Sequence, residues 1–373
     1  MKIEYAEVLA IAPAADRLTW AHDLPGQFMT GTILRLVSDD GCEGVGGVCT
    51  YSATGFDRAA AESLRHLLPE LVGADPLAHE AIMARLRPRT LPTVPGAISA
   101  VDIALWDWLG KQVGLPIYQL LGGARPRIPA YASTPLLTDA DAYVDFVSQL
   151  REQGFRAIKF HCWCVPERDL EMLRAVRKAH PDPDLVLMLD VENNYDRPAA
   201  LRVARELEEL GVLWFEAPLP DFDLEGYRLL RQHTSVQIVP AGNWVLDPQG
   251  IASGLASGAW DAARIDATVG GGITAARDAC VLARAYGATC ELQCWGYTLS
   301  QAANLHVMLG TPGCRFFEQP VPYAPFEYGM KTVVRTGPDG YVEAPLGPGL
   351  GVEIDWAAMR AAAIVHLDSR GNG

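Results

Sequence analysis

The chain has 373 residues, with 31 Lys or Arg against 45 Asp or Glu, which gives a formal net charge of −14 at pH 7. Nucleic-acid-binding proteins usually present a basic face to phosphate, so this charge argues against such a partner. The N-terminal residues lack a leader pattern, and no apolar run reaches the roughly 20 residues of a membrane span, so we expect a cytoplasmic protein with no membrane partner.

The first part of the chain predicts strands over residues 1–11 and 30–48, with a hairpin turn at Asp40-Gly41. A loop rich in Pro, Gly and Asp lies between these segments and carries Trp20, and the loop that follows them carries Tyr51. Long loops of this composition often cover a site, so Trp20 and Tyr51 are candidate substrate contacts.

Residues 58–121 show helical periodicity, with apolar residues such as Ile98, Val101 and Leu105 recurring on one face. Strands followed by helices predict an α+β unit over residues 1–125.

From residue 126 short apolar strands alternate with helical segments, and two early strands lie at 128–133 and near Lys159. The six later strands end at polar residues spaced 23–27 residues apart, namely Asp190, Glu216, Asn243, Asp266, Gln293 and Glu318. Eight such strands close a parallel barrel whose catalytic face lies at the strands' carboxyl ends. The oxygen-bearing side chains of Asp190, Glu216 and Asn243 therefore predict a site for a hard divalent cation, Mg²⁺.

Several motifs in a fixed order resemble the enolase superfamily, and within it the mandelate racemase and sugar-acid dehydratase group (the mandelate racemase/muconate lactonizing enzyme family). They are AVDIALWDWLGKQVGLPIYQLLGG, Lys159 with His161, Asp190, WFEAP around Glu216, RIDATVGGGIT around Asp266, and Glu318. The resemblance covers nearly the whole chain. It implies an α/β fold with a modified (β/α)7β TIM-like barrel over residues 126–335, an N-terminal α+β capping domain, a C-terminal segment, 336–373, that returns to the cap, and a homo-oligomer.

The family's shared reaction is abstraction of the proton α to a carboxylate, with Mg²⁺ neutralising the charge that develops. Asp190 and Glu216 match its first two metal ligands. Asn243 stands where the family has Glu or Asp, and its neutral oxygen lowers the ligand charge from three negatives to two, so we expect weaker metal binding.

Lys159 and His161 alternate along one strand and so point to the same face. They match the family's Lys-x-Lys, with histidine in second place. We expect His161 to act as an acid/base and Lys159 to act either as a base partner or as the cation that holds the substrate carboxylate. A buried structural histidine is the alternative.

The family's other acid/base group is a histidine paired with an aspartate. Asp266 matches the aspartate, but Gln293 stands in the histidine's place, and an amide does not usefully exchange protons. Two-base proton transfer is therefore not expected. A single acid/base face, with or without Asp266, still supports syn elimination of water.

Glu318 matches a family glutamate that stabilises the far carboxylate oxygen in its protonated form, and we expect burial to raise its pKa. A salt-bridged glutamate is the alternative. Asn193, Tyr195, Gln293 and Trp295 lie at or just beyond strand ends and are candidate substrate contacts.

Together these features predict an Mg²⁺-dependent lyase that dehydrates a small-molecule carboxylate, a hydroxy acid and most simply a sugar acid. Two alternatives stay open. One is a racemase or epimerase, which needs a second base. The other is a binding or regulatory protein that has lost catalysis, which the changes at Asn243 and Gln293 would fit.

Overall fold

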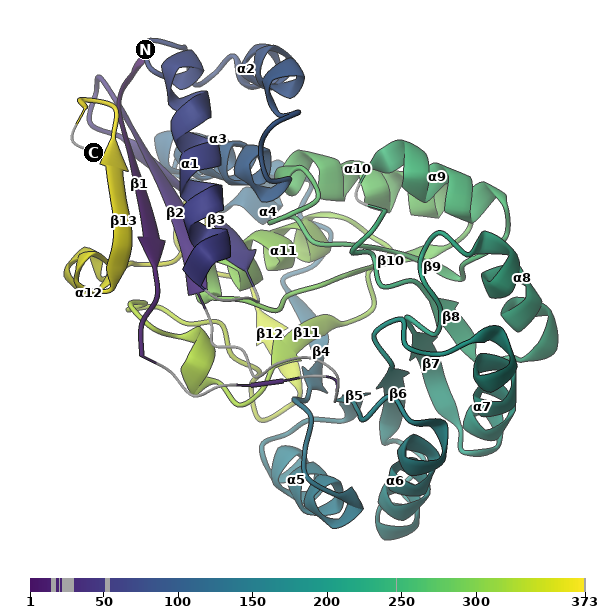
Figure 1. The fold of residues 1–373 in the computed structure, drawn as a ribbon. Helices are drawn as coiled ribbons and strands as arrows, with labels where there is room; N and C mark the ends of the chain where they lie inside the picture. The colour runs from purple at the N-terminus through teal and green to yellow at the C-terminus, as the bar shows by residue number, and fades with distance from the viewer. Residues whose placement is uncertain (15–17, 20, 22–29, 51–53, 246, 372–373) are drawn as a thin grey trace.

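The computed structural model describes the chain apart from residues 15–17, 20, 22–29, 51–53, 246 and 372–373. Two candidate substrate contacts, Trp20 and Tyr51, lie outside the described residues. A four-stranded antiparallel sheet with its helices occupies one end of the molecule, and a ring of strands surrounded by helices occupies the other (Figure 1). None of the described helices combines the length and the apolar composition that a bilayer span requires.

The first unit is an antiparallel sheet, in the order β13-β1-β2-β3, covered by helices. Its strands are β1 (Ile3–Ile11), β2 (Thr30–Ser38), β3 (Glu43–Thr50) and β13 (Ala363–Asp368). Its helices are α1 (Thr54–Leu71), α2 (His79–Leu86), η1 (Arg87–Arg89), α3 (Gly96–Val113) and α4 (Ile117–Leu120). Alternate residues of β1 face opposite sides, so Val8 and Ala10 join the core under these helices while Leu9 and Ile11 join the core shared with the barrel.

Helix α3 joins this unit to the barrel. A Cβ on Gly44 or Gly46 of β3 would lie about 2 Å from a carbonyl oxygen of α3, so only glycine allows the two elements to pack this closely. The buried Asp102 of α3 accepts hydrogen bonds from the backbone and the hydroxyl of Thr274, at the start of α10 (Gly272–Ala285), at 3.1 and 2.6 Å. These contacts fix the sheet over one side of the ring of strands.

Eight strands form the ring in chain order. They are β4 (Arg127–Ser133), β5 (Ala157–His161), β6 (Val186–Asp190), β7 (Val212–Glu216), β8 (Gln237–Val239), β9 (Ala262–Ile265), β10 (Thr289–Leu292) and β11 (Phe317–Pro320). A parallel ladder runs β11-β4-β5-β6-β7-β8, and β9 pairs in parallel with β10. Between β8 and β9 the described residues show no ladder, although Asp261 donates to Ile238 at 3.0 Å.

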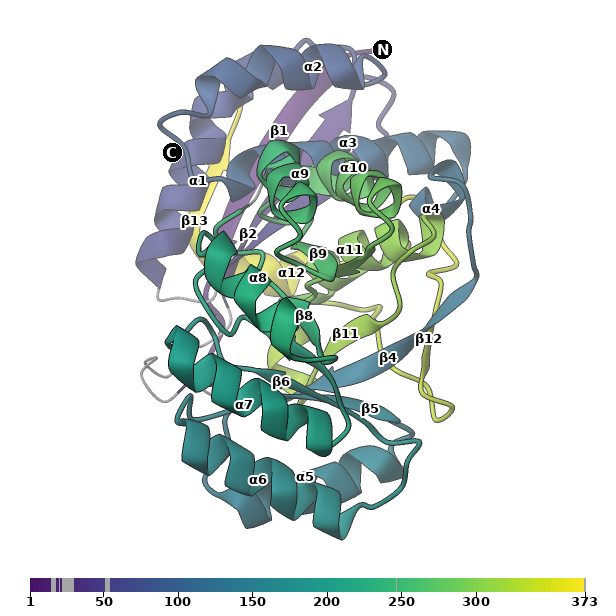
Figure 2. The ribbon, with the colours of Figure 1, turned by 90° about the vertical axis from the view of Figure 1, so that its right-hand side faces the viewer.

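Seven helices follow the first seven of these strands and surround the ring (Figure 2). They are α5 (Ala140–Glu152), α6 (Pro166–Ala179), α7 (Arg197–Glu209), α8 (Leu224–His233), α9 (Pro248–Ala256), α10 and α11 (Thr298–Gly310). Four of them begin at an aspartate whose carboxylate accepts a backbone N–H of the first turn, the standard N-cap. These caps are Asp139, Asp196, Asp223 and Asp247. The order of strands and helices confirms the predicted α/β fold with a (β/α)7β barrel.

The inside of the ring is layered. An apolar layer contains one residue from each of β4 to β9, namely Tyr131, Ala157, Met188, Trp214, Val239 and Ala262. Two residues further along several of these strands the inward positions become polar. They are Ser133, Lys159, Asp190, Glu216 and Arg264, all buried. The change from apolar to polar marks the floor of the site.

The last part of the chain runs back along both units. It contains η2 (Ala324–Phe326), β12 (Tyr341–Glu343) and α12 (Trp356–Ala361) before β13. Strand β12 pairs antiparallel with β4 of the barrel, and β13 pairs antiparallel with β1.

Candidate active site

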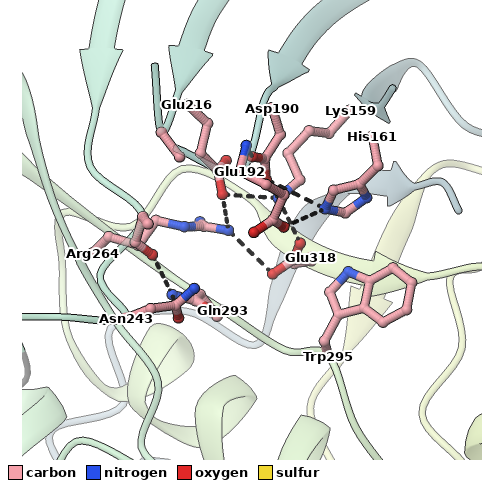
Figure 3. Close-up of a pocket in the computed structure, with 12 residues that line it drawn as sticks. Lys159, His161, Asp190, Glu192, Glu216, Asn243, Arg264, Gln293, Trp295 and Glu318 are labelled. Atoms are coloured by element: carbon pink, nitrogen blue, oxygen red, sulfur yellow. Dashed lines mark hydrogen bonds and ion pairs between the residues drawn. The ribbon is translucent and has the colours of Figure 1, made fainter. Parts of the chain in front are cut away.

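An open cavity of about 440 Å³ lies at the carboxyl ends of the barrel strands. Strands β5 to β11 and the loops after them supply its walls (Figure 3). The lining residues are Lys159, His161, Asp190, Glu192, Glu216, Ala217, Ala241, Asn243, Arg264, Gln293, Trp295 and Glu318. Eight of the residues predicted from the sequence therefore meet around one cavity.

Lys159 lies at the centre of the charged groups. Its Nζ is 2.9 Å from both Asp190 Oδ2 and Glu216 Oε1 and 3.0 Å from Glu318 Oε1, and the residue is 1% exposed. Burial disfavours the ammonium, but the three carboxylates outweigh it and raise the pKa of Lys159 well above its ordinary value. Lys159 is therefore a fixed cation in this arrangement.

His161 stands beside Lys159 on the same face of β5. Its Nδ1 donates to the carbonyl of Thr134 at 2.5 Å, and its Nε2 is 3.3 Å from Asp190 Oδ2 and 3.5 Å from Glu192 Oε1. Burial lowers the pKa of His161, but hydrogen bonds with the two carboxylates raise it to about 10. Because Nδ1 is engaged, Nε2 is the nitrogen that faces the cavity.

Arg264 is a second buried cation, 2% exposed, in the middle of the carboxylates. Its Nη2 lies 2.7 Å from Glu216 Oε1 and 3.3 Å from Glu318 Oε2, and Glu318 Oε2 also accepts the backbone N–H of Cys294 at 3.0 Å. Burial raises the pKa of Glu318, yet Lys159 and Arg264 outweigh it and lower the value to about 2. The expectation of a raised pKa for Glu318 is therefore wrong for this arrangement, because two cations lie against the carboxylate.

The pKa of Glu216 shifts in the opposite direction to the pKa values of Asp190 and Glu318. Burial raises the pKa of Glu216 to about 8, with Asp190 and Glu318 adding to the shift and Arg264 and Lys159 opposing it. By contrast, Lys159 and His161 overcome burial and hold the pKa of Asp190 well below its ordinary value. Of the carboxyl groups around Lys159, Glu216 takes up a proton most readily.

Asn243 and Gln293 form a polar pair on the opposite wall (Figure 3). Gln293 Nε2 donates to Asn243 Oδ1 at 3.1 Å and also to the carbonyl of Ala241. Asn243 is exposed, whereas Gln293 is 8% exposed. The Gln293 amide thus holds the Asn243 amide in place across this wall.

Trp295 is held against both His161 and the floor. Its ring contacts the His161 ring edge to face at a centroid distance of 5.4 Å. Its Nε1 donates to Ser133 Oγ at 2.9 Å, and Ser133 Oγ donates in turn to Glu318 Oε1 at 2.9 Å.

Three predicted residues do not line the cavity. Asp266 is buried, and its Oδ1 accepts hydrogen bonds from Thr268 and from Asn304 Nδ2, at 2.7 to 2.8 Å. Tyr195 donates to Asp169 Oδ2 at 2.7 Å, and the backbone N–H of Asn193 donates to Ala217 at 2.8 Å. Asp266 and Tyr195 therefore have side-chain partners outside the cavity walls, whereas the backbone of Asn193 is held by Ala217, which lines the cavity.

Two lining residues, Arg264 and Glu192, were not predicted. Arg264 lies two residues before Asp266, and Glu192 lies two residues after Asp190. For Arg264, alternation along a strand was the available signal, because residues two apart in a strand share a face, whereas Glu192 lies beyond the end of β6 and had no such signal. A charged residue inside the apolar strand β9 was a second signal for Arg264.

Family models match both the barrel and the N-terminal unit of the chain. The family model described as "Enolase C-terminal domain-like" matches residues 142–358, and the model described as "Mandelate racemase / muconate lactonizing enzyme, N-terminal domain" matches residues 27–122. A D-galactarolactone cycloisomerase from Agrobacterium fabrum is 29% identical over 88% of this chain and 89% of its own length.

A D-galactonate dehydratase family member from Streptomyces bingchenggensis is 30% identical over 87% of each chain. Among solved structures, a protein from Pseudovibrio sp. described as of the mandelate racemase/muconate lactonizing enzyme type is 40% identical, with a TM-score of 0.95 over 98% of both chains.

Proposed function

The chain belongs to the mandelate racemase/muconate lactonizing enzyme family of the enolase superfamily, and from this premise we propose that it is a metal-dependent lyase that removes water from a hydroxy acid. The relative named as a D-galactonate dehydratase family member supports a sugar acid as the substrate. The observation that carries the proposal is the position of His161 Nε2 beside Lys159 and the buried carboxylates, on one face of one cavity.

The residues present fit a divalent cation. Asp190 and Glu216 offer carboxylate oxygens, the ligands that Mg²⁺ prefers. Glu216 Oε2 is buried and has no hydrogen-bond partner among the described residues, which is rare for a carboxylate oxygen unless an ion or water completes it. We infer a Mg²⁺ site that includes Asp190 and Glu216; Asn243 is the third ligand only in the prediction from the sequence. When bound, Mg²⁺ supplies positive charge that makes the proton α to a carboxylate easier to remove.

The chain's own residues perform the proton transfer. Burial lowers the pKa of His161, but hydrogen bonds with Asp190 and Glu192 raise it to about 10, and a divalent cation held by Asp190 would oppose that rise and favour the neutral imidazole. In this neutral form His161 takes the α-proton at Nε2, because Nδ1 donates to Thr134. Lys159, held as an ammonium, stabilises the negative charge that develops on the substrate carboxylate. The C–O bond to the β-carbon then breaks, and His161 returns the proton to the departing hydroxide, so one face of the substrate is used throughout.

Gln293 disfavours the racemase alternative. The family resemblance assigns its position to the second base, and its amide donates to Ala241 and Asn243. A side-chain amide is neither a useful acid nor a useful base near neutral pH, so it cannot deliver a proton to the second face of the substrate.

A cycloisomerase is the second candidate, and a specific observation favours it. The relative from Agrobacterium fabrum, named as a D-galactarolactone cycloisomerase, matches this chain over nearly its whole length. The same proton abstraction would serve it if the β-oxygen that leaves belongs to a lactone ring. The product would then have the mass of the substrate.

The test is incubation with Mg²⁺ and a panel of sugar acids and their lactones in D2O, followed by proton NMR and mass spectrometry. We expect one panel member to lose water, and His161→Asn to abolish this. His233→Asn, an exposed histidine on α8, is the matched control that keeps activity. A product of unchanged mass with an opened ring would identify the cycloisomerase, and α-deuterium without elimination would identify the epimerase. No turnover or deuterium exchange with any member would contradict the proposal.

A further inference from the structure

We propose that Glu192, and not Asn243, supplies the third ligand oxygen of the metal site. This inference rests on the proposed function, because it assigns a ligand to the cation proposed there. Asn243 Oδ1 already accepts a hydrogen bond from Gln293 Nε2 at 3.1 Å, on an exposed residue at the far wall. Glu192 offers a charged oxygen on the side where Asp190 lies (Figure 3).

The backbone after β6 turns Glu192 back into the cavity. The N–H of Glu192 donates to Asp190 Oδ1 at 3.1 Å, and Glu192 and Asn193 adopt the left-handed conformation, with φ of 49° and 63°. Non-glycine residues adopt this conformation rarely, and it is concentrated at functional sites. The N–H of Asn193 then donates to Ala217 at the end of β7, at 2.8 Å, which fixes the turn against the strand that carries Glu216.

The geometry of the carboxylates suits one small cation. One ligand atom each from His161, Asp190 and Glu192 lies within 4.8 Å of the other two. Oxygens on one Mg²⁺ are separated by roughly 3–4 Å, so small side-chain movements bring the Asp190 and Glu192 oxygens to ligand distance. Glu216 Oε2 has no partner among the described residues, on a residue that is 3% exposed and lines the same cavity, which independently indicates a cation-binding position.

The charge of the ligand oxygens also favours Glu192. A carboxylate offers Mg²⁺ a negatively charged oxygen, whereas the side-chain amide of Asn243 is neutral. With Glu192 beside Asp190 and Glu216 the site has three carboxylate ligands, and with Asn243 in its place it has two.

Direct binding of Mn²⁺, followed by electron paramagnetic resonance of the free ion and by calorimetry, tests the assignment without any turnover. We expect Glu192→Gln to weaken Mn²⁺ binding by at least about 10-fold. Loss of a residue that only hydrogen-bonds to a metal ligand already weakens metal binding by about 10-fold or more, and loss of a ligand itself should cost no less. Asn243→Ala should change the Kd less than about 3-fold, since a partly exposed amide that is not a ligand contributes little.

Glu167→Gln is the matched control, because it makes the same substitution on a side chain of α6 that is 74% exposed. Unchanged binding in Glu192→Gln, or a large loss in Asn243→Ala, overturns the assignment while leaving the metal site in place. If the unmodified protein itself binds no Mn²⁺ at millimolar concentration, the proposed metal-dependent function fails as well. Near-ultraviolet circular dichroism of each variant separates lost binding from lost folding.

Discussion

Arg264 provides the sharpest test of how the site is held together. Arg264→Met removes the guanidinium that lies 2.7 Å from Glu216 and 3.3 Å from Glu318, while leaving an unbranched side chain in place of the arginine stem. Removing one partner of a buried ion pair costs about 3–5 kcal/mol, because the other charge stays buried. Lys159 still contacts both carboxylates, and Arg264 Nε and Nη1 have no partner among the described residues, so the variant also loses two unsatisfied donors. Both effects place the expected loss near the lower end, about 3 kcal/mol.

The loss should depend on pH through Glu216. The pKa of Glu216 in the folded protein is about 8, above its ordinary 4.5, so between these values the folded state keeps a proton that the unfolded state releases. This group therefore lowers stability as pH rises through that window. Without Arg264 the pKa of Glu216 rises further, so we expect the deficit of Arg264→Met to be greater near about pH 8 than near about pH 6.

Urea unfolding at both pH values, followed by tryptophan fluorescence, measures the deficit. Arg202→Met is the matched control, because the same substitution removes an ion pair to Glu167 in which both side chains are more than half exposed. That pair should be worth less than about 1 kcal/mol. Equal destabilisation by Arg264→Met and Arg202→Met, or a deficit that shrinks as pH rises, would refute the reasoning. Added Mg²⁺ should stabilise Arg264→Met more than the unmodified protein, because the cation replaces the lost charge.

Three further predictions concern other parts of the chain. Trp295→Phe removes the indole N–H that donates to Ser133 Oγ. We expect urea unfolding to show a stability loss of about 1 kcal/mol and the sugar-acid assay to show reduced turnover. Full activity of the variant would contradict a role for this hydrogen bond in the site. Burial raises the pKa of Asp169 from 3.8 to about 6. The unfolding free energy should therefore fall as pH rises between these two values and then level off. Asp169→Asn should flatten the curve of unfolding free energy against pH. Gly272→Ala places a Cβ about 2.1 Å from a side-chain oxygen of α3, at a φ of 94°. It should destabilise the protein by more than the control Gly287→Ala, for which roughly 1 kcal/mol is expected because its φ is also positive but its Cβ meets nothing within 4 Å. Equal melting temperatures of the two variants would argue against the close packing at Gly272.

The barrel was predictable because parallel strands buried on both sides appear in the sequence as short apolar runs. Strands β6 and β7 end at Asp190 and Glu216, as the spacing predicts, and Gln293 follows directly after β10. Strand β8 ends at Val239, four residues before Asn243. That extra length of loop separates Asn243 from the strand and leaves it exposed, which spacing alone does not show.

Site residues were predictable where the local sequence pattern determines which way a side chain points. Properties that depend on residues far apart in the sequence were not. Lys159 and His161 share a face because alternation along a strand requires it. The lowered pKa of Glu318 depends on Lys159 and Arg264, which are far from it in sequence. The left-handed turn at Glu192 contains no glycine, the usual sequence signal of such a turn. Only the three-dimensional structure therefore shows that the Glu192 carboxylate points into the cavity.

The pairing of β13 with β1 has a consequence for how the protein is made. Strand β1 lies between β2 and β13, and its Glu7 contacts His366, which is 359 residues away in the sequence. At a synthesis rate of about 5–20 residues per second, β1 waits roughly 20–70 s for this partner. All eight barrel strands leave the ribosome earlier, because β11 ends at Pro320. The sheet whose first strand is translated first is therefore completed last, and until then one edge of β1 is open to pairing with a neighbouring nascent chain.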